Sequence, residues 1–201
     1  MLRLHPVSSV KKPKLPQVRF ESAESWDEWL AEHHESAPGV WAMIAKKASG
    51  VPTVAYPEVL DIAISYGWID GQRRALDDTF FLQKFCPRGP RSRWSRINRD
   101  KAIRMIEDGQ MKPAGLREVD QAKADGRWDA AYEPQSSAKV PDDLQAALDA
   151  NPQAREFFGT LNSQNRYAIL YRVNDAKRPD TRARRIAQFV EMLAKGEKLY
   201  P

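Results

Sequence analysis

The strongest constraint on the fold is a change of pattern at the segment CPRGPRSR, residues 86–93. Before it, residues 40–47 form an apolar run, and residues 68–85 are typical of two strands that meet at Asp77 and Asp78. After it, the pattern is helical throughout. Strands followed by helices predict an α+β fold: a small antiparallel or mixed sheet with flanking helices, followed by a helical C-terminal region.

Capping patterns predict where the helices begin. Ser25 and Glu28 have the spacing of a capping box, which predicts the start of a first amphipathic helix. Further helices are expected to begin at the prolines Pro57, Pro113, Pro141, Pro152 and Pro179. In the helix that Pro113 begins, an apolar stripe of Leu116, Val119 and Ala122 is the expected buried face.

Composition divides the chain into an arm and two domains. Residues 1–18 contain three prolines and three lysines among few apolar groups, which predicts a flexible N-terminal arm. We expect an α+β domain over residues 19–132 and a helical domain over residues 140–196, with a loop or linker between them.

The composition is that of a soluble globular protein, with 42% hydrophobic and 29% charged residues. The single cysteine, Cys86, excludes an intrachain disulfide and fits a reducing compartment. The first residues lack the apolar core of a signal peptide, and no apolar run is long enough to span a bilayer. We therefore expect a cytoplasmic protein without a membrane span.

Three stretches of sequence carry a resemblance to a known family. They are WDEWL with YGWIDGQ, then FCPRGPRSRWSRIN, then AKRPDTRARRIAQFVEMLAKG near the C-terminus. Together they resemble the YdeI/OmpD-associated (bacteriocin-protection) proteins of bacteria over residues 20–196. The resemblance implies a role in stress response or antimicrobial-peptide resistance. Some members are described as periplasmic, whereas this sequence shows no export signal, which argues against a direct envelope role and leaves an indirect cytoplasmic role open.

One cluster of polar and aromatic residues is a candidate ligand pocket. Its members are Trp68, Asp70, Arg73, Arg88, Trp94, Ser95 and Asn98. Arginine forks bind carboxylate or phosphate and tryptophan offers apolar faces, so a small anionic or aromatic ligand would fit. The alternative is structural: Asp70 pairs with Arg73 or Arg88, the tryptophans are core residues, and Ser95 caps a helix.

Nucleic-acid binding is a second hypothesis, based on the basic run from Arg88 to Arg104. Helical spacing argues against it. Lys101 and Arg104 lie on the side of Ile97, whereas Arg96 and Arg99 lie beside Ile103, so the charges do not form one face. A solvated surface or internal salt bridges account for the run better.

An unrecognised enzyme that uses the Trp/Asp/Arg cluster is the third hypothesis. The sequence contains no nucleotide-binding or hydrolase motif and predicts no metal or cofactor. Nothing in the sequence brings a histidine near Cys86, and the adjacent His33 and His34 diverge on a helix. The leading hypothesis is a non-enzymatic binding or protective protein whose partner is a small ligand or another protein.

Overall fold

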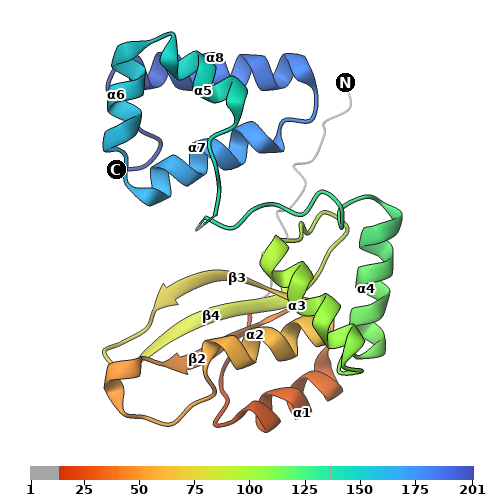
Figure 1. Ribbon diagram of the computed structural model, residues 1–201. Helices are drawn as coiled ribbons and strands as arrows, with labels where there is room; N and C mark the ends of the chain where they lie inside the picture. The colour runs from red at the N-terminus through yellow and green to blue at the C-terminus, as the bar shows by residue number, and fades with distance from the viewer. Residues whose placement is uncertain (1–13, 136) are drawn as a thin grey trace, which may run out of the picture. The chain divides into compact units, whose positions relative to one another are not determined.

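The computed structural model describes residues 14–135 and 137–201 and divides into two compact units (Figure 1). The first unit comprises the chain up to Trp94 together with Asn98–Ala130, and the second comprises Ser95–Ile97 with Ala131–Pro201. Of the predicted N-terminal arm, residues 1–13 lie outside the described residues, while Gln17 and Val18 belong to a strand. The predicted α+β class is confirmed.

A four-stranded mixed sheet forms the framework of the first unit. Its strands are β1 (Gln17–Arg19), β2 (Val40–Ala45), β3 (Trp68–Ala75) and β4 (Phe80–Pro87), in the order β1-β2-β4-β3. β1 runs parallel to β2, and β4 is antiparallel to both β2 and β3. β3 and β4 form the predicted hairpin, whose turn is fixed by the Asp77 carboxylate as it accepts from the Thr79 and Phe80 amides at 2.8 and 2.7 Å.

Helices α1 (Ala23–His33) and α2 (Tyr56–Ser65) pack on one face of this sheet, and α3 (Arg96–Glu107) and α4 (Pro113–Ala124) follow (Figure 1). A short 3₁₀ turn, η1 (Lys47–Ser49), lies between β2 and α2. Trp26 joins the layers: its indole N–H donates to the Val59 carbonyl at 3.0 Å, and its ring lies 5.6 Å from that of Phe85. A fully buried tryptophan thus anchors α1 to α2 and β4.

The predicted first cap is wrong by one turn of helix. Helix α1 begins after Ser22, whose hydroxyl accepts from the Ser25 amide at 3.3 Å while the Ser25 hydroxyl contacts the Ser22 amide at 3.2 Å. A serine at the third helical position closes this capping box, where the sequence pattern favours Glu or Gln. Ser25 therefore lies inside the helix rather than before it.

Four helices form the second unit: α5 (Asp142–Asp149), α6 (Pro152–Thr160), α7 (Ser163–Asp175) and α8 (Pro179–Ala194). The predicted starts at Pro152 and Pro179 are confirmed. Their shared core is apolar and consists of Leu144, Leu148, Ala154, Phe158, Leu161, Ile169, Leu170, Val173, Ile186, Phe189 and Leu193. Among the described residues, no helix has both the length and the apolar character of a membrane span.

Candidate functional site

Trp68, the first of the predicted site residues, is a core residue of the first unit. Its side chain is 1% exposed, and its indole N–H donates to the His34 carbonyl at 3.1 Å. The rings of Trp26 and Trp29 meet it edge-on at 6.4 and 5.8 Å. This geometry stabilises the contact between α1 and the start of β3.

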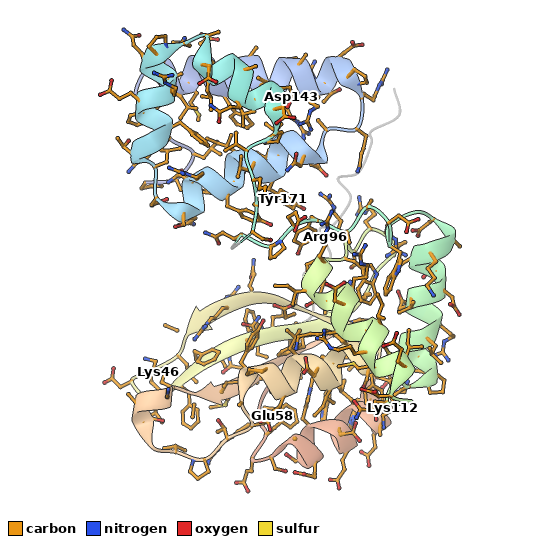
Figure 2. All side chains as sticks on the ribbon, in the orientation of Figure 1. Lys46, Glu58, Arg96, Lys112, Asp143 and Tyr171 are labelled. Atoms are coloured by element: carbon orange, nitrogen blue, oxygen red, sulfur yellow. The ribbon has the colours of Figure 1, made fainter. Side chains whose placement is uncertain are left out.

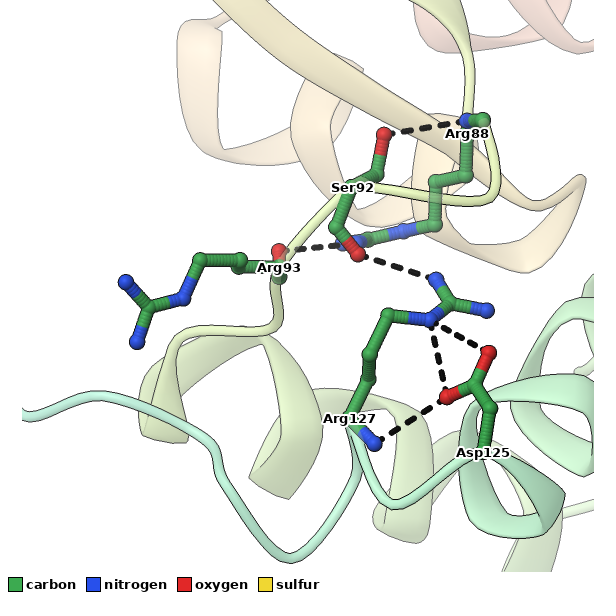
Figure 3. Close-up of polar contacts among 6 residues, drawn as sticks. Arg88, Ser92, Arg93, Asp125 and Arg127 are labelled. Atoms are coloured by element: carbon green, nitrogen blue, oxygen red, sulfur yellow. Dashed lines mark hydrogen bonds and ion pairs between the residues drawn. The ribbon is translucent and has the colours of Figure 1, made fainter. Parts of the chain in front are cut away.

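Arg88 and Trp94 form a second group, in the loop that leads from β4 to α3, and Figure 3 shows Arg88 in this loop. The Arg88 guanidinium lies 3.6 Å from the centroid of the Trp94 ring and donates to the Arg93 carbonyl at 3.2 Å. Both side chains are buried, at 5% and 0% exposed. Asn98, at the start of α3, is also buried, and Ser95 forms an isolated β-bridge with Tyr132.

Arg127 ties the same loop to the segment after α4. Its guanidinium donates to the Ser92 carbonyl at 2.9 Å and pairs with the Asp125 carboxylate at 2.7 Å (Figure 3). The loop also closes on itself, because the Gly89 amide donates to the Ser92 hydroxyl at 2.9 Å. These contacts favour a structural interpretation for Arg88 and Trp94.

The basic run that suggested nucleic-acid binding is largely engaged in local contacts. Arg96 pairs with Glu133, Arg99 lies 3.5 Å from Asp100, and Lys101 pairs with Asp61 across to α2. Charges that are already paired release few counterions on binding a phosphate backbone. The contacts therefore favour the interpretation as internal salt bridges.

Asp70 and Arg73 lie together on one face of β3 because of a β-bulge. Residues three apart in a regular strand point to opposite faces. Here Asp70 is opposite Phe85 and Arg73 is opposite Gln83, so three steps on β3 match two on β4. The Gln83 amide donates to the Gly71 carbonyl at 2.9 Å and thereby satisfies a backbone group of the bulge.

Arg73 lines a pocket of about 550 Å³ at the edge of the first unit, which we call the Arg73 pocket. Its wall combines the end of β2, the η1 segment, the start of α2 and parts of β3 and β4. Its residues are Ile44, Ala45, Lys46, Lys47, Gly50, Val51, Thr53, Val54, Ala55, Tyr56, Arg73 and Phe81. Three of them are cationic and none is acidic, and Figure 2 shows one of the cations, Lys46, after the end of β2.

Contacts with neighbouring groups hold Arg73 and Tyr56 in the wall of the Arg73 pocket. The Arg73 guanidinium stacks 3.7 Å from the centroid of the Phe81 ring, while the Tyr56 hydroxyl donates to the Asp70 carboxylate at 2.9 Å. Burial, followed by the nearby Asp70 charge, raises the pKa of Tyr56 above its ordinary value. Tyr56 therefore stays a neutral hydrogen-bond donor, and Arg73 lines the pocket beside the Phe81 ring.

Sequence reasoning identified Asp70 and Arg73 but missed Tyr56, Lys46 and Lys47. The two lysines follow an apolar strand and look like an ordinary solvated end, while Tyr56 lies at the start of a helix. Gly71 is a hint in the sequence, because glycine inside a strand pattern often marks a bulge, but it does not give the strand pairing that puts Asp70 and Arg73 on one face.

Other reactive groups of the first unit are held by local contacts. A ring nitrogen of His33 lies 2.9 Å from the Trp29 carbonyl, and one of His34 lies 2.8 Å from the Leu30 carbonyl. Cys86 is half-buried on β4, and burial raises the pKa of its thiol. Over residues 14–135 and 137–201, no three histidine, cysteine or acidic side chains gather as metal ligands would.

The helices of the second unit match a family model described as "Bacteriocin-protection, YdeI or OmpD-Associated", over residues 137–196. We call this region the bacteriocin-protection domain, after the model that it matches. A second model, described as a domain of unknown function (DUF8412), matches residues 18–118, which is half of the chain, and the chain belongs to that family. No curated protein and no solved structure is significantly similar to the chain.

The two matches refine the resemblance seen in the sequence. The third stretch, AKRPDTRARRIAQFVEMLAKG, lies within the bacteriocin-protection domain, as expected. The first two stretches, which include YGWIDGQ and FCPRGPRSRWSRIN, lie within the other matched domain. The bacteriocin-protection match therefore covers 137–196, not the whole of 20–196.

The bacteriocin-protection domain contains a groove of about 890 Å³ between α5, α6 and α8. Ala147, Ile186 and Val190 contribute apolar surface to it. Two ion pairs border this surface, Arg182 with Asp143 at 2.5 Å and Lys195 with Glu191 at 2.7 Å. Because these four charges are satisfied within the domain, the Arg73 pocket is the better candidate site for a charged ligand.

Proposed function

We propose that this chain is a non-enzymatic binding protein of the cytoplasm that contributes to protection against bacteriocins and other antimicrobial peptides. The bacteriocin-protection domain at residues 137–196 supports the protective role. The Arg73 pocket supports the binding role, with a small anionic ligand that has an apolar part as its occupant.

The carrying observation is the combination of three cations and no carboxylate among the residues that line a partly apolar pocket. An arginine fork can bind a carboxylate or phosphate through two parallel hydrogen bonds. The stack of Arg73 on Phe81 holds the guanidinium in place before any ligand arrives, which lowers the entropic cost of binding. Val51, Val54 and Phe81 can then contact the apolar part of the ligand.

Calorimetric titration of the full chain with phenyl phosphate, inorganic phosphate and phenol tests this site. Phenyl phosphate should bind most tightly, because it alone has both an anionic and an apolar part. Arg73→Gln should weaken binding about tenfold or more through loss of a charge-assisted hydrogen bond. Arg74→Gln is the matched control, since Arg74 stacks on Trp41 at 4.5 Å from the neighbouring position and does not line the pocket. Equal losses in both variants, or no binding by the unaltered chain, would refute the site.

A deletion strain tests the protective role. Cells without the gene should be more sensitive to cationic antimicrobial peptides, and the unaltered gene should restore resistance whereas Arg73→Gln should not. Cell fractionation should recover the chain with cytoplasmic proteins. Unchanged sensitivity of the deletion strain, or recovery of the chain outside the cytoplasm, would contradict the proposal.

A further inference from the structure

Helix α7 presents two different faces. Asn165, Ile169 and Val173 are buried and pack toward the core of the second unit. Three to four residues apart on another face lie Gln164, Tyr167 and Tyr171, which line a pocket of about 440 Å³. Figure 2 shows Tyr171 on this helix.

Two more tyrosines from distant parts of the sequence complete this pocket, which we call the tyrosine pocket. Tyr132 comes from the segment before α5, and its ring meets that of Tyr171 edge-on at 5.4 Å. Tyr200 comes from the segment after α8. The full lining is Tyr132, Gln164, Tyr167, Ala168, Tyr171, Arg172 and Tyr200.

Two hydrogen bonds to Asn165 fix the position of the Tyr200 backbone. The Tyr200 amide donates to the side-chain oxygen of Asn165 at 2.9 Å, and the Asn165 amide nitrogen donates to the Tyr200 carbonyl at 3.2 Å. Asn165 is 1% exposed, so the side-chain half of this two-way contact is buried. Asn165 therefore holds the Tyr200 side of the pocket against α7.

Arg172 is the only charged residue among those that line the tyrosine pocket. Its guanidinium donates to the Ala168 carbonyl at 3.1 Å and to the Tyr200 hydroxyl at 3.2 Å. A guanidinium has five N–H donors, so these two contacts leave others for a ligand. The contacts also hold the group in one orientation beside the rings.

We propose that the tyrosine pocket binds a planar aromatic compound with one acidic group. The four tyrosine rings offer faces and edges for an aromatic ring, and Arg172 pairs with the acid. A volume of about 440 Å³ is within the range of small-molecule sites. This site lies in the second unit, and its residues are separate from those of the Arg73 pocket.

Titration of the full chain with 1-naphthoate, cyclohexanecarboxylate and 1-naphthalenemethanol tests the proposal, because the last two lack the aromatic face and the charge respectively. 1-Naphthoate should bind most tightly. Arg172→Gln and Tyr171→Leu should each weaken its binding about tenfold. Tyr171→Phe should keep most of the affinity, since the ring remains. Arg184→Gln, which removes an exposed charge of α8 outside the pocket, should have no effect.

Further measurements separate this site from its alternatives. Arg73→Gln should leave 1-naphthoate binding unchanged, and binding that is lost in Arg73→Gln but kept in Arg172→Gln would overturn the proposal. Equal affinity for cyclohexanecarboxylate and 1-naphthoate would also overturn the proposal. Binding of a single-stranded nucleic acid such as oligothymidylate, without binding of 1-naphthoate, would overturn it too. If Tyr171→Leu does not fold by circular dichroism, Arg172→Gln decides the outcome.

Discussion

At the scale of single residues, Gly115 sets how closely α4 approaches α2. A Cβ at this position would lie 2.5 Å from the Met111 sulfur and closer still to the Ser65 carbonyl oxygen. This close approach also explains why the predicted stripe on α4 is partly wrong. Val119 and Ala122 are buried, but Leu116 is 38% exposed while Ala114 and Gly115 face the core. By hydrophobicity, Leu116 is the expected buried residue. Close contact between two helices instead needs the residue without a side chain, which is Gly115.

Substitution of this glycine should therefore destabilise the first unit. Gly115→Ala is expected to lower the free energy of unfolding by about 1–3 kcal/mol, because a backbone carbonyl cannot move aside without shifting a helix. Gly159→Ala on α6 is the matched control. No atom lies within 4 Å of its added Cβ, and it should stabilise by about 0.4–1 kcal/mol. Urea denaturation of both variants measures the difference, and a neutral Gly115→Ala would contradict the packing described.

At the scale of elements, local sequence signals predicted where several strands and helices lie, but not how these elements pair and pack. The β2 run, the β3–β4 hairpin and the starts of α6 and α8 follow from apolar runs, turn residues and prolines, which act within a few residues. The β-bulge at Gly71 does not follow from such signals, since it depends on how β3 pairs with β4. Without the bulge, Asp70 and Arg73 would be assigned to opposite faces, so their shared face was not predictable.

One side chain links three elements of the bacteriocin-protection domain. Arg182 on α8 contacts the Asp143 carboxylate of α5 through two nitrogens, at 2.5 and 2.9 Å, and donates to the Val173 carbonyl of α7 at 2.9 Å. Arg182→Gln should lower the free energy of unfolding by about 1–2 kcal/mol, a value that allows for the partial exposure of the pair. Arg155→Gln is the control, because its single contact with Asp149 is longer, at 3.6 Å, and more exposed.

The same pair predicts a dependence on pH. The hydrogen bond from Arg182 lowers the pKa of the Asp143 carboxyl below its ordinary value of about 3.9. A lowered pKa in the folded state means that the contribution to stability is present above about pH 4 and is lost as the pH falls further. The difference in unfolding free energy between the unaltered chain and Asp143→Asn should therefore shrink from pH 7 to pH 3. A constant difference across that range would show that the ion pair does not stabilise the domain.

At the scale of the whole molecule, the candidate sites depend on contacts that sequence alone does not report. The Arg73 pocket joins residues from Ile44 to Phe81, and the tyrosine pocket joins Tyr132 to Tyr200. Chemical character was visible in the sequence, since Asp70 and Arg73 were among the predicted residues. Their partners were not, because Tyr56 and the two lysines reach the site only through the path of the loop between β2 and α2.

The division into two units predicts two separable unfolding transitions. All six tryptophans lie in the first unit, so tryptophan fluorescence reports on that unit alone, whereas far-ultraviolet circular dichroism reports on helices in both.

Leu148 is 1% exposed in the core of the second unit, and Leu148→Ala should destabilise that unit by about 2–5 kcal/mol. In urea, this variant should shift part of the dichroism transition and leave the fluorescence transition in place. Val59→Ala, in the core of the first unit, should shift the fluorescence transition instead. A fluorescence transition that moves with Leu148→Ala would mean that the two units unfold as one cooperative body.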